Sequence, residues 1–378
     1  MAEQPAPTFT WLRNGREAFP AMLAAIEAAQ RSVRLEKYIF SGDELGQQFR
    51  DALVRAQQRG AQVRVLLDAV GSYSLARGFW TALTAAGGAV RFFNPIAFHR
   101  FGIRDHRKLL VCDEQVAFIG GFNIASDYLG DGVTRGWSDL GLQLRGPLAA
   151  ELAASFDDMF DRAYFRHKRF ARLRRTGVKR VVCCPTEQLL LSGPGRGPNP
   201  IRQALHRDLR SARDVTIVVA YFLPPWGLRR DLARVVRRGG QVRLVLAGRS
   251  DVRVSQLAAR SLYRRLLKSG IRIAEYQPQV LHAKLFVIDH VVYLGSANLD
   301  PRSLAINYEL MVRFQDERLA MEARLLIEEL PAQCVEISLD AWRASRSLWQ
   351  KIKERWAYLL LARLDPYVVR WQWRILPD

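Results

Sequence analysis

Two short segments of the chain carry the same set of reactive side chains. Each contains His-x-Lys, and four residues separate the lysine from an aspartate. The catalytic set that they define is His106, Lys108, Asp113, His282, Lys284 and Asp289. Because imidazole titrates near neutral pH, one histidine could attack a phosphorus atom while the other protonates the departing oxygen. The lysines would stabilise charge on the phosphate oxygens, so the two motifs predict phosphodiester chemistry that needs no metal.

Small residues and an asparagine follow each motif. They are Gly120, Gly121 and Asn123 in the first segment, and Gly295, Ser296 and Asn298 in the second. The asparagines are predicted to bind phosphate oxygens. The apolar runs VAFI and VVYL are typical of returning hairpin strands, which would bring each asparagine back beside its own histidine and lysine. The second hairpin is one residue shorter, which leaves the role of Ser296 open.

A nucleophilic histidine needs a carboxylate on its second ring nitrogen to fix its tautomer. Asp139 in GWSDLGLQL and Glu309 in INYELMVRF follow the two motifs, and we expect them to orient the histidines. Asp113 and Asp289 belong to the motifs, but an apolar strand separates each from its histidine. Within the catalytic set we therefore interpret these two as structural acceptors in turns.

The segments that must position these side chains recur in the same order. RGAQVRVLL (59–67) matches RGGQVRLVL (238–246), and VRLEKYIF (33–40) matches VTIVVAYFL (215–223). A β-branched run after an amphipathic stretch and a glycine is typical of a helix followed by a strand. The chain is therefore predicted to contain two copies of one α/β unit, with both histidine sets facing a single pocket.

The charge of the chain indicates an anionic partner. The 378 residues include 57 Lys and Arg against 37 Asp and Glu, a formal charge of +20. Nucleic acid, an acidic membrane surface or a phosphorylated substrate would each fit this excess. The four cysteines match neither a disulfide framework nor a zinc site. No run is long and apolar enough for a membrane span, and the first residues do not resemble a secretory signal.

Composition divides the chain into three parts. Residues 1–180 form the first unit and end in a basic linker, RHKRFARLRRTGVKR (166–180). Residues 181–330 form the second unit, and residues 331–378 form an aromatic and basic extension. In the extension Trp342, Trp349 and Trp356 recur every seven residues. Together with Leu348, Ile352, Leu359 and Leu360 they predict one stripe of an amphipathic helix, either packed on the protein or lying at a membrane surface.

The duplicated HxKx4D motif with its trailing G[GS]xN resembles the phospholipase D superfamily, over roughly residues 10–330. Within it, the order of EKYIF (36–40), LLDAVGS (66–72), GGFNI (120–124) and GSANLDPRS (295–303) is most similar to bacterial cardiolipin synthases of the short, non-spanning type. The resemblance implies two α/β/α sandwich domains with pseudo-twofold symmetry, and the tryptophan spacing adds a C-terminal amphipathic helical tail.

The resemblance also implies a reaction. One histidine would carry a covalent phosphohistidine, and the N-terminal position favours His106. A phosphatidyl group would pass to phosphatidylglycerol and form cardiolipin, with phosphatidylglycerol or phosphatidylethanolamine as donor. No cofactor or metal is implied. The protein would act at an anionic membrane surface, on the cytoplasmic face of the bacterial cell membrane.

Three other hypotheses stay open. The same histidine pair could serve a phospholipase D-type hydrolase, or a nuclease or phosphodiesterase that acts on nucleic acid, which the basic charge fits equally well. A scaffold with an inactive site would bind anionic membranes without chemistry. The tryptophan-rich extension disfavours the nuclease, and the completeness of both His-Lys-Asn sets disfavours the scaffold.

Overall fold

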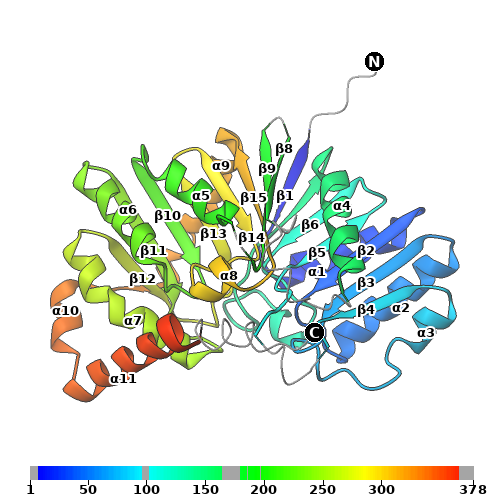
Figure 1. Cartoon of the computed structure of the whole chain (residues 1–378), viewed down its shortest axis with the longest axis horizontal. Coiled ribbons are helices and arrows are strands. Elements are labelled where there is room, and N and C mark those ends of the chain that lie inside the picture. Colours follow the sequence, from blue (N-terminus) through cyan, green and yellow to red (C-terminus); the bar gives the residue numbers. More distant parts are fainter. Residues whose placement is uncertain (1–6, 96–101, 164–178, 185, 196, 366–378) are drawn as a thin grey trace.

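The repeated segments form two central β-sheets that lie side by side (Figure 1). The computed structural model describes residues 7–95, 102–163, 179–184, 186–195 and 197–365. The basic linker (166–180) and the end of the extension therefore lie almost entirely outside the described residues. Among the described residues the first sheet has seven strands, in the order β1-β7-β6-β5-β2-β3-β4, and the second has nine, in the order β16-β12-β11-β10-β13-β14-β15-β9-β8.

The elements of the first half follow the predicted alternation of strands and helices. They are β1 (Thr8–Leu12), α1 (Gly15–Ala28), β2 (Ser32–Lys37), α2 (Glu44–Gln58), β3 (Gln62–Asp68), α3 (Thr81–Ala85), β4 (Ala89–Phe93), β5 (Leu109–Cys112), β6 (Val116–Gly120), the 3₁₀ turn Ser126–Tyr128, β7 (Gly141–Arg145) and α4 (Leu148–Asp161).

The second half repeats this pattern and adds elements at its end. They are β8 (Arg180–Cys183), β9 (Glu187–Ser192), α5 (Pro200–Asp208), β10 (Asp214–Val219), α6 (Trp226–Arg237), β11 (Gln241–Ala247), α7 (Arg253–Lys268), β12 (Arg272–Tyr276), β13 (Lys284–Ile288), β14 (Val291–Gly295), α8 (Pro301–Ala305), β15 (Glu309–Gln315), α9 (Glu317–Glu328), β16 (Cys334–Glu336), α10 (Leu339–Ala344) and α11 (Leu348–Leu359), which continues as a π-helical turn over Leu360–Leu364.

The two sheets share one strand order. β2, β3 and β4 are parallel and correspond to β10, β11 and β12, while the antiparallel hairpin β5–β6 corresponds to β13–β14. The central strands are buried along nearly their whole length because helices cover the sheets, which explains their continuous apolar runs. This confirms the predicted pair of α/β units.

The two halves share a hydrophobic core where they meet. Leu109, Leu144 and Phe156 of the first half belong to the same buried cluster as Leu285 and Leu310 of the second. Two short parallel bridges also join the halves, Asp105 with Tyr308 and Ser138 with Leu281. These contacts fix the position of one motif relative to the other.

The extension differs from the single helical stripe that the tryptophan spacing predicts. β16 pairs with β12 and so adds an edge strand to the second sheet. The chain then forms two helices, because Ser347 caps a new helix at Leu348 through a capping box with Gln350. Trp342 is buried against Tyr263, whereas Trp349 and Trp356 are exposed, so the three tryptophans do not share one face.

Among the described residues, no helix combines the length and the apolar character that crossing a bilayer requires.

Candidate active site

The two motif histidines lie just before the hairpins, in the segments that join the halves. The His106 amide donates to the Tyr308 carbonyl (3.0 Å), and the His282 amide donates to the Ser138 carbonyl (2.7 Å). His106 therefore precedes β5, and His282 precedes β13. Each histidine is thus anchored on a backbone segment of the opposite half.

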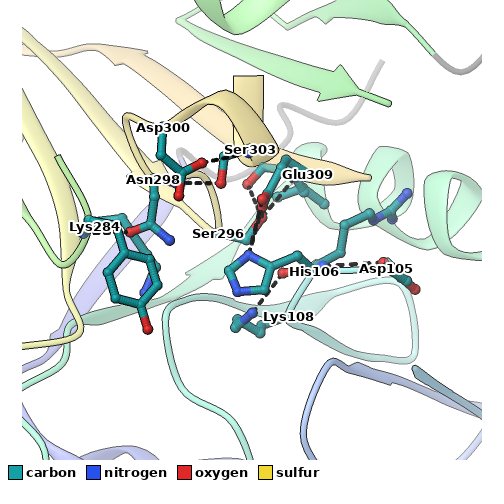
Figure 2. A network of polar contacts seen from close by, with 12 residues as sticks. Asp105, His106, Lys108, Lys284, Ser296, Asn298, Asp300, Ser303 and Glu309 are labelled. Carbon is teal, nitrogen blue, oxygen red and sulfur yellow. Dashed lines mark hydrogen bonds and ion pairs between the residues drawn. The ribbon is translucent and has the colours of Figure 1, made fainter. Parts of the chain in front are cut away.

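As a result, each histidine is paired with a carboxylate from the opposite half. Tyr308 precedes Glu309, and the Nδ1 atom of His106 lies 3.1 Å from both Glu309 carboxylate oxygens (Figure 2). Ser138 precedes Asp139, and the Nδ1 atom of His282 lies 2.7 Å from its Oδ2 atom. A carboxylate on Nδ1 holds a proton there and leaves Nε2 available for phosphorus. Sequence reasoning finds both carboxylates but does not assign either to the opposite half.

The lysines lie beside their histidines and are fully buried. Lys108 Nζ donates to the His106 carbonyl at 2.7 Å, and Lys284 Nζ lies 2.9 and 3.1 Å from the two ring nitrogens of His282. Burial lowers the pKa of Lys108 to about 7, aided by the charge of Lys284, and lowers the pKa of Lys284 to about 8. Two cations gathered this closely favour an anionic ligand such as a phosphodiester.

The two histidine–carboxylate pairs differ electrostatically. Burial and then the neighbouring lysines lower the pKa of both histidines, and that of His106 falls well below its usual value. Burial would raise the pKa of Asp139, but the charge and hydrogen bond of His282 outweigh it and keep that pKa low. Burial raises the pKa of Glu309 to about 8 although Lys108 opposes it. His282 therefore has the stronger anionic partner.

The asparagines are held by backbone contacts in equivalent ways. The Oδ1 atom of Asn123 accepts from the Ile39 amide (3.0 Å), and that of Asn298 accepts from the Tyr221 amide (3.3 Å). Asn298 lies beside Lys284 in Figure 2. Asn123 instead reaches the other half, since its Nδ2 atom donates to the Tyr128 hydroxyl (2.6 Å), which lies 3.4 Å from the His282 ring. Asn123 is therefore linked through Tyr128 to the histidine of the other half, a contact that its predicted position beside His106 does not include.

Asp113 and Asp289 lie away from the histidines, at the opposite ends of strands β5 and β13. Asp113 accepts from the amides of Gln30, Arg31 and Ser32 at 2.8–3.0 Å. Asp289 accepts from the backbone amides of Arg213 and Asp214, at the start of β10, at 3.0 and 2.9 Å. Both backbones adopt a positive φ in the hairpin turns. The geometry agrees with the turn-acceptor interpretation and gives neither aspartate a place in the chemistry.

Sequence reasoning missed several residues of the site. Lys37 is fully buried and donates to the Phe122 carbonyl at 3.0 Å, and burial lowers its pKa to about 7. Tyr38 packs edge-on against the His106 ring, while Tyr128 and Trp137 contact the His282 ring. Lys37 and Tyr38 belong to the EKYIF segment (36–40), which could have identified them as site residues. No repeated motif contains Tyr128 or Trp137.

The fold and the paired histidines define a phosphoryl-transferring enzyme of the phospholipase D superfamily. A family model described as "Cardiolipin synthase, PLD-like domain" matches residues 22–163 and 205–330. The chain belongs to this cardiolipin synthase family, and it is a phosphatidyltransferase of the phospholipase D superfamily.

Individual proteins agree with this assignment. Cardiolipin synthase B of Escherichia coli K12 is 31% identical over 374 residues, covering 95% of this chain and 89% of that protein. A cardiolipin synthase of Geobacillus kaustophilus is 33% identical over 79% of this chain and 61% of its own length. The crystal structure of a phosphatidylserine synthase from Haemophilus influenzae shares the fold, with a TM-score of 0.74 at 16% identity over 95% of this chain and 94% of that one.

Proposed function

We propose that this enzyme makes cardiolipin by transferring a phosphatidyl group to phosphatidylglycerol through a phosphohistidine intermediate. The observation that carries the proposal is the crossed pairing, in which each histidine receives its carboxylate from the opposite half. This pairing gives one site two oriented imidazoles among buried lysines. We infer the lipid substrate from the names of the proteins similar in sequence, which are cardiolipin synthases.

In the first step, Nε2 of His106 attacks the phosphorus of the donor lipid. The P–O bond to the headgroup alcohol breaks, and the departing oxygen takes a proton from His282. The strongly lowered pKa of His106 favours a neutral, nucleophilic ring, whereas the ionised Asp139 partly offsets the lowering of the His282 pKa and so favours His282 as the ring that carries the proton. The difference between the two pairs thus supports His106 as nucleophile and His282 as acid.

In the second step, His282 removes a proton from a hydroxyl of phosphatidylglycerol. That oxygen attacks phosphorus, the P–N bond to His106 breaks, and cardiolipin leaves with His106 neutral again. Lys108 and Lys284 offset the charge of the phosphate oxygens in both steps. Asn123 and Asn298 are proposed as further phosphate ligands.

The aromatic walls of the site favour transfer over hydrolysis. Only 11% of the His106 side chain and 5% of the His282 side chain are exposed. Tyr38 covers one ring, and Tyr128 and Trp137 cover the other. A lipid hydroxyl that enters this site meets less competition from water than it would in an open site.

The excess of positive charge supports peripheral binding at the anionic cytoplasmic face of the bacterial membrane. Phosphatidylglycerol is the proposed acceptor, and either phosphatidylglycerol or phosphatidylethanolamine is the proposed donor. Incubation with labelled vesicles of each composition, followed by lipid separation, identifies the donor. Cleavage of DNA without any cardiolipin formation would instead support a nuclease.

The roles of the two histidines can be separated with a leaving group that needs no proton. His106→Ala and His282→Ala should each lower cardiolipin formation by about 10²–10⁴-fold. With a short-chain p-nitrophenyl phosphodiester, His282→Ala should still release nitrophenolate in a burst and gain the mass of the phosphatidyl group, whereas His106→Ala should do neither. The reverse result would make His282 the nucleophile, and activity near wild type in either variant would contradict the paired mechanism.

A further inference from the structure

Helix α11 presents an apolar face to solvent. Its outward side chains include Leu348, Trp349 and Trp356, which are 78%, 64% and 66% exposed. Ile352, Leu359, Leu360 and Leu364 extend the same surface, and we call these seven residues the α11 face. At 3.6 residues per turn this face points away from Ala357, which packs on the core of the second half. Exposed apolar surface of this extent marks a binding site rather than a solvated helix.

The positive and negative side chains of this segment point in different directions. Its four cations, Lys351, Lys353, Arg355 and Arg363, are exposed. Its carboxylates, Glu354 and Asp365, turn inward and pair with arginines of the protein. Lys353 also lies over the Trp349 ring, 5.6 Å from its centre. Tryptophans and leucines flanked by cations match the boundary between the anionic headgroups and acyl chains of a bilayer.

An ion pair connects this segment to the active site. Arg302 donates to Asp365 through Nε (2.6 Å) and Nη2 (2.5 Å). Arg302 lies on α8, the short helix between Asn298 and Glu309. The same helix holds Ser303, whose hydroxyl accepts from the Asn298 amide (3.1 Å). The α11 face is therefore fixed relative to the residues that bind phosphate and orient His106.

We infer that the α11 face docks on an anionic lipid surface and that the Arg302–Asp365 pair sets the orientation of the active site on it. The inference rests on the proposed function, because it takes the substrates to be bilayer lipids, and it identifies the surface through which the enzyme meets them. The exposed cations favour a membrane over a second copy of the chain, because two α11 faces in contact would bring cations together.

Vesicle binding tests the docking surface without requiring catalysis. The wild-type protein should sediment with phosphatidylcholine vesicles that contain phosphatidylserine, and less with phosphatidylcholine alone. The double variant Trp349→Ser/Trp356→Ser should bind the anionic vesicles about tenfold more weakly or worse. Trp226→Ser is the matched control, because Trp226 is a 59% exposed tryptophan on α6, and it should bind as wild type does. Unchanged binding by the double variant, or an equal loss in the control, would overturn the inference.

Size-exclusion chromatography tests whether a second copy of the chain, instead of a membrane, covers the α11 face. A change from dimer to monomer in the double variant, with vesicle binding intact, would make the face a self-interface and overturn the inference. Cardiolipin formation is read separately. If the wild type forms none while the binding pattern holds, the proposed function fails and the docking surface stands.

The role of the ion pair has its own test. Asp365→Asn removes the charge but keeps the size of the side chain. It should bind vesicles normally, lower kcat on vesicle lipids several-fold, and leave turnover of a monomeric short-chain phosphatidylglycerol unchanged. Asp365→Glu should restore part of the loss. An equal loss on both substrates would show a general structural effect and refute the orienting role.

Discussion

Gly121 and Ser296 occupy equivalent turns but meet carboxylates of different length. A Cβ atom on Gly121 would lie 2.0 Å from Oδ1 of Asp139, so only glycine leaves room for that carboxylate. The hydroxyl of Ser296 instead donates to Glu309, as Figure 2 shows. The two turns thus hold the two carboxylates by different means, which explains why Ser296 stands where the first copy has glycine.

Ser296→Ala should shift the pH dependence of the reaction. Burial raises the pKa of Glu309 to about 8, and the hydrogen bond from Ser296 opposes that rise. Without it the pKa rises further, and an ionised Glu309, which must hold the proton of His106, is reached only at higher pH. The acidic limb of kcat/KM should move up by about one pH unit.

A buried serine on the neighbouring strand provides the control for this shift. Ser192 pairs in register with Glu309, and its hydroxyl has no hydrogen-bond partner among the described residues. Ser192→Ala should leave the profile in place. An unchanged profile in Ser296→Ala would contradict the role assigned to its hydroxyl.

At the scale of elements, the hairpins hold the site through the turns at their far ends. The carboxylate of Asp113 ties the β5–β6 turn to the start of β2, and Asp289 ties the β13–β14 turn to the start of β10. Because β2 and β10 are the strands that pair with β5 and β13, these bonds set the register of the strands that lead to the histidines.

Asp113→Ala should therefore cost stability rather than chemistry. It leaves three backbone amides without their acceptor and places alanine at a φ of 56°. We expect a loss of about 2–4 kcal/mol in the free energy of unfolding, and a smaller loss for Asp113→Asn, which keeps an acceptor and tolerates positive φ. Denaturant titration measures both. A large loss of activity per folded molecule, with stability intact, would return Asp113 to the catalytic residues.

At the scale of the whole molecule, neither half contains a complete site. Each histidine is paired with a carboxylate of the other half, and Lys284 of the second half lowers the pKa of Lys108 in the first. The shared core and the two bridges hold the halves in this arrangement. Association of the halves therefore concentrates positive charge where the phosphate is expected.

The burial of Lys284 predicts a pH-dependent stability. Burial lowers the pKa of Lys284 to about 8, whereas the unfolded chain keeps the ordinary value of 10.5. Between these values the unfolded state binds more protons, so raising the pH favours the folded state. Relative to Lys284→Met, the free energy of unfolding of the wild type should rise from about pH 8 to about pH 10.5. A difference that stays flat over this range would contradict the lowered pKa.

Local features of the sequence were enough to predict the duplicated α/β units, the reactive residue types and a position in turns for the motif aspartates. These features depend on local spacing and apolar periodicity, which repeat along the chain. Three features became apparent only in the folded chain: each histidine pairs with a carboxylate of the opposite half, Tyr128 links Asn123 to His282, and Trp342 is buried. The first two depend on how one sheet packs against the other, and the third depends on where a helix ends and a new one begins. Residue spacing along the chain does not predict either of these.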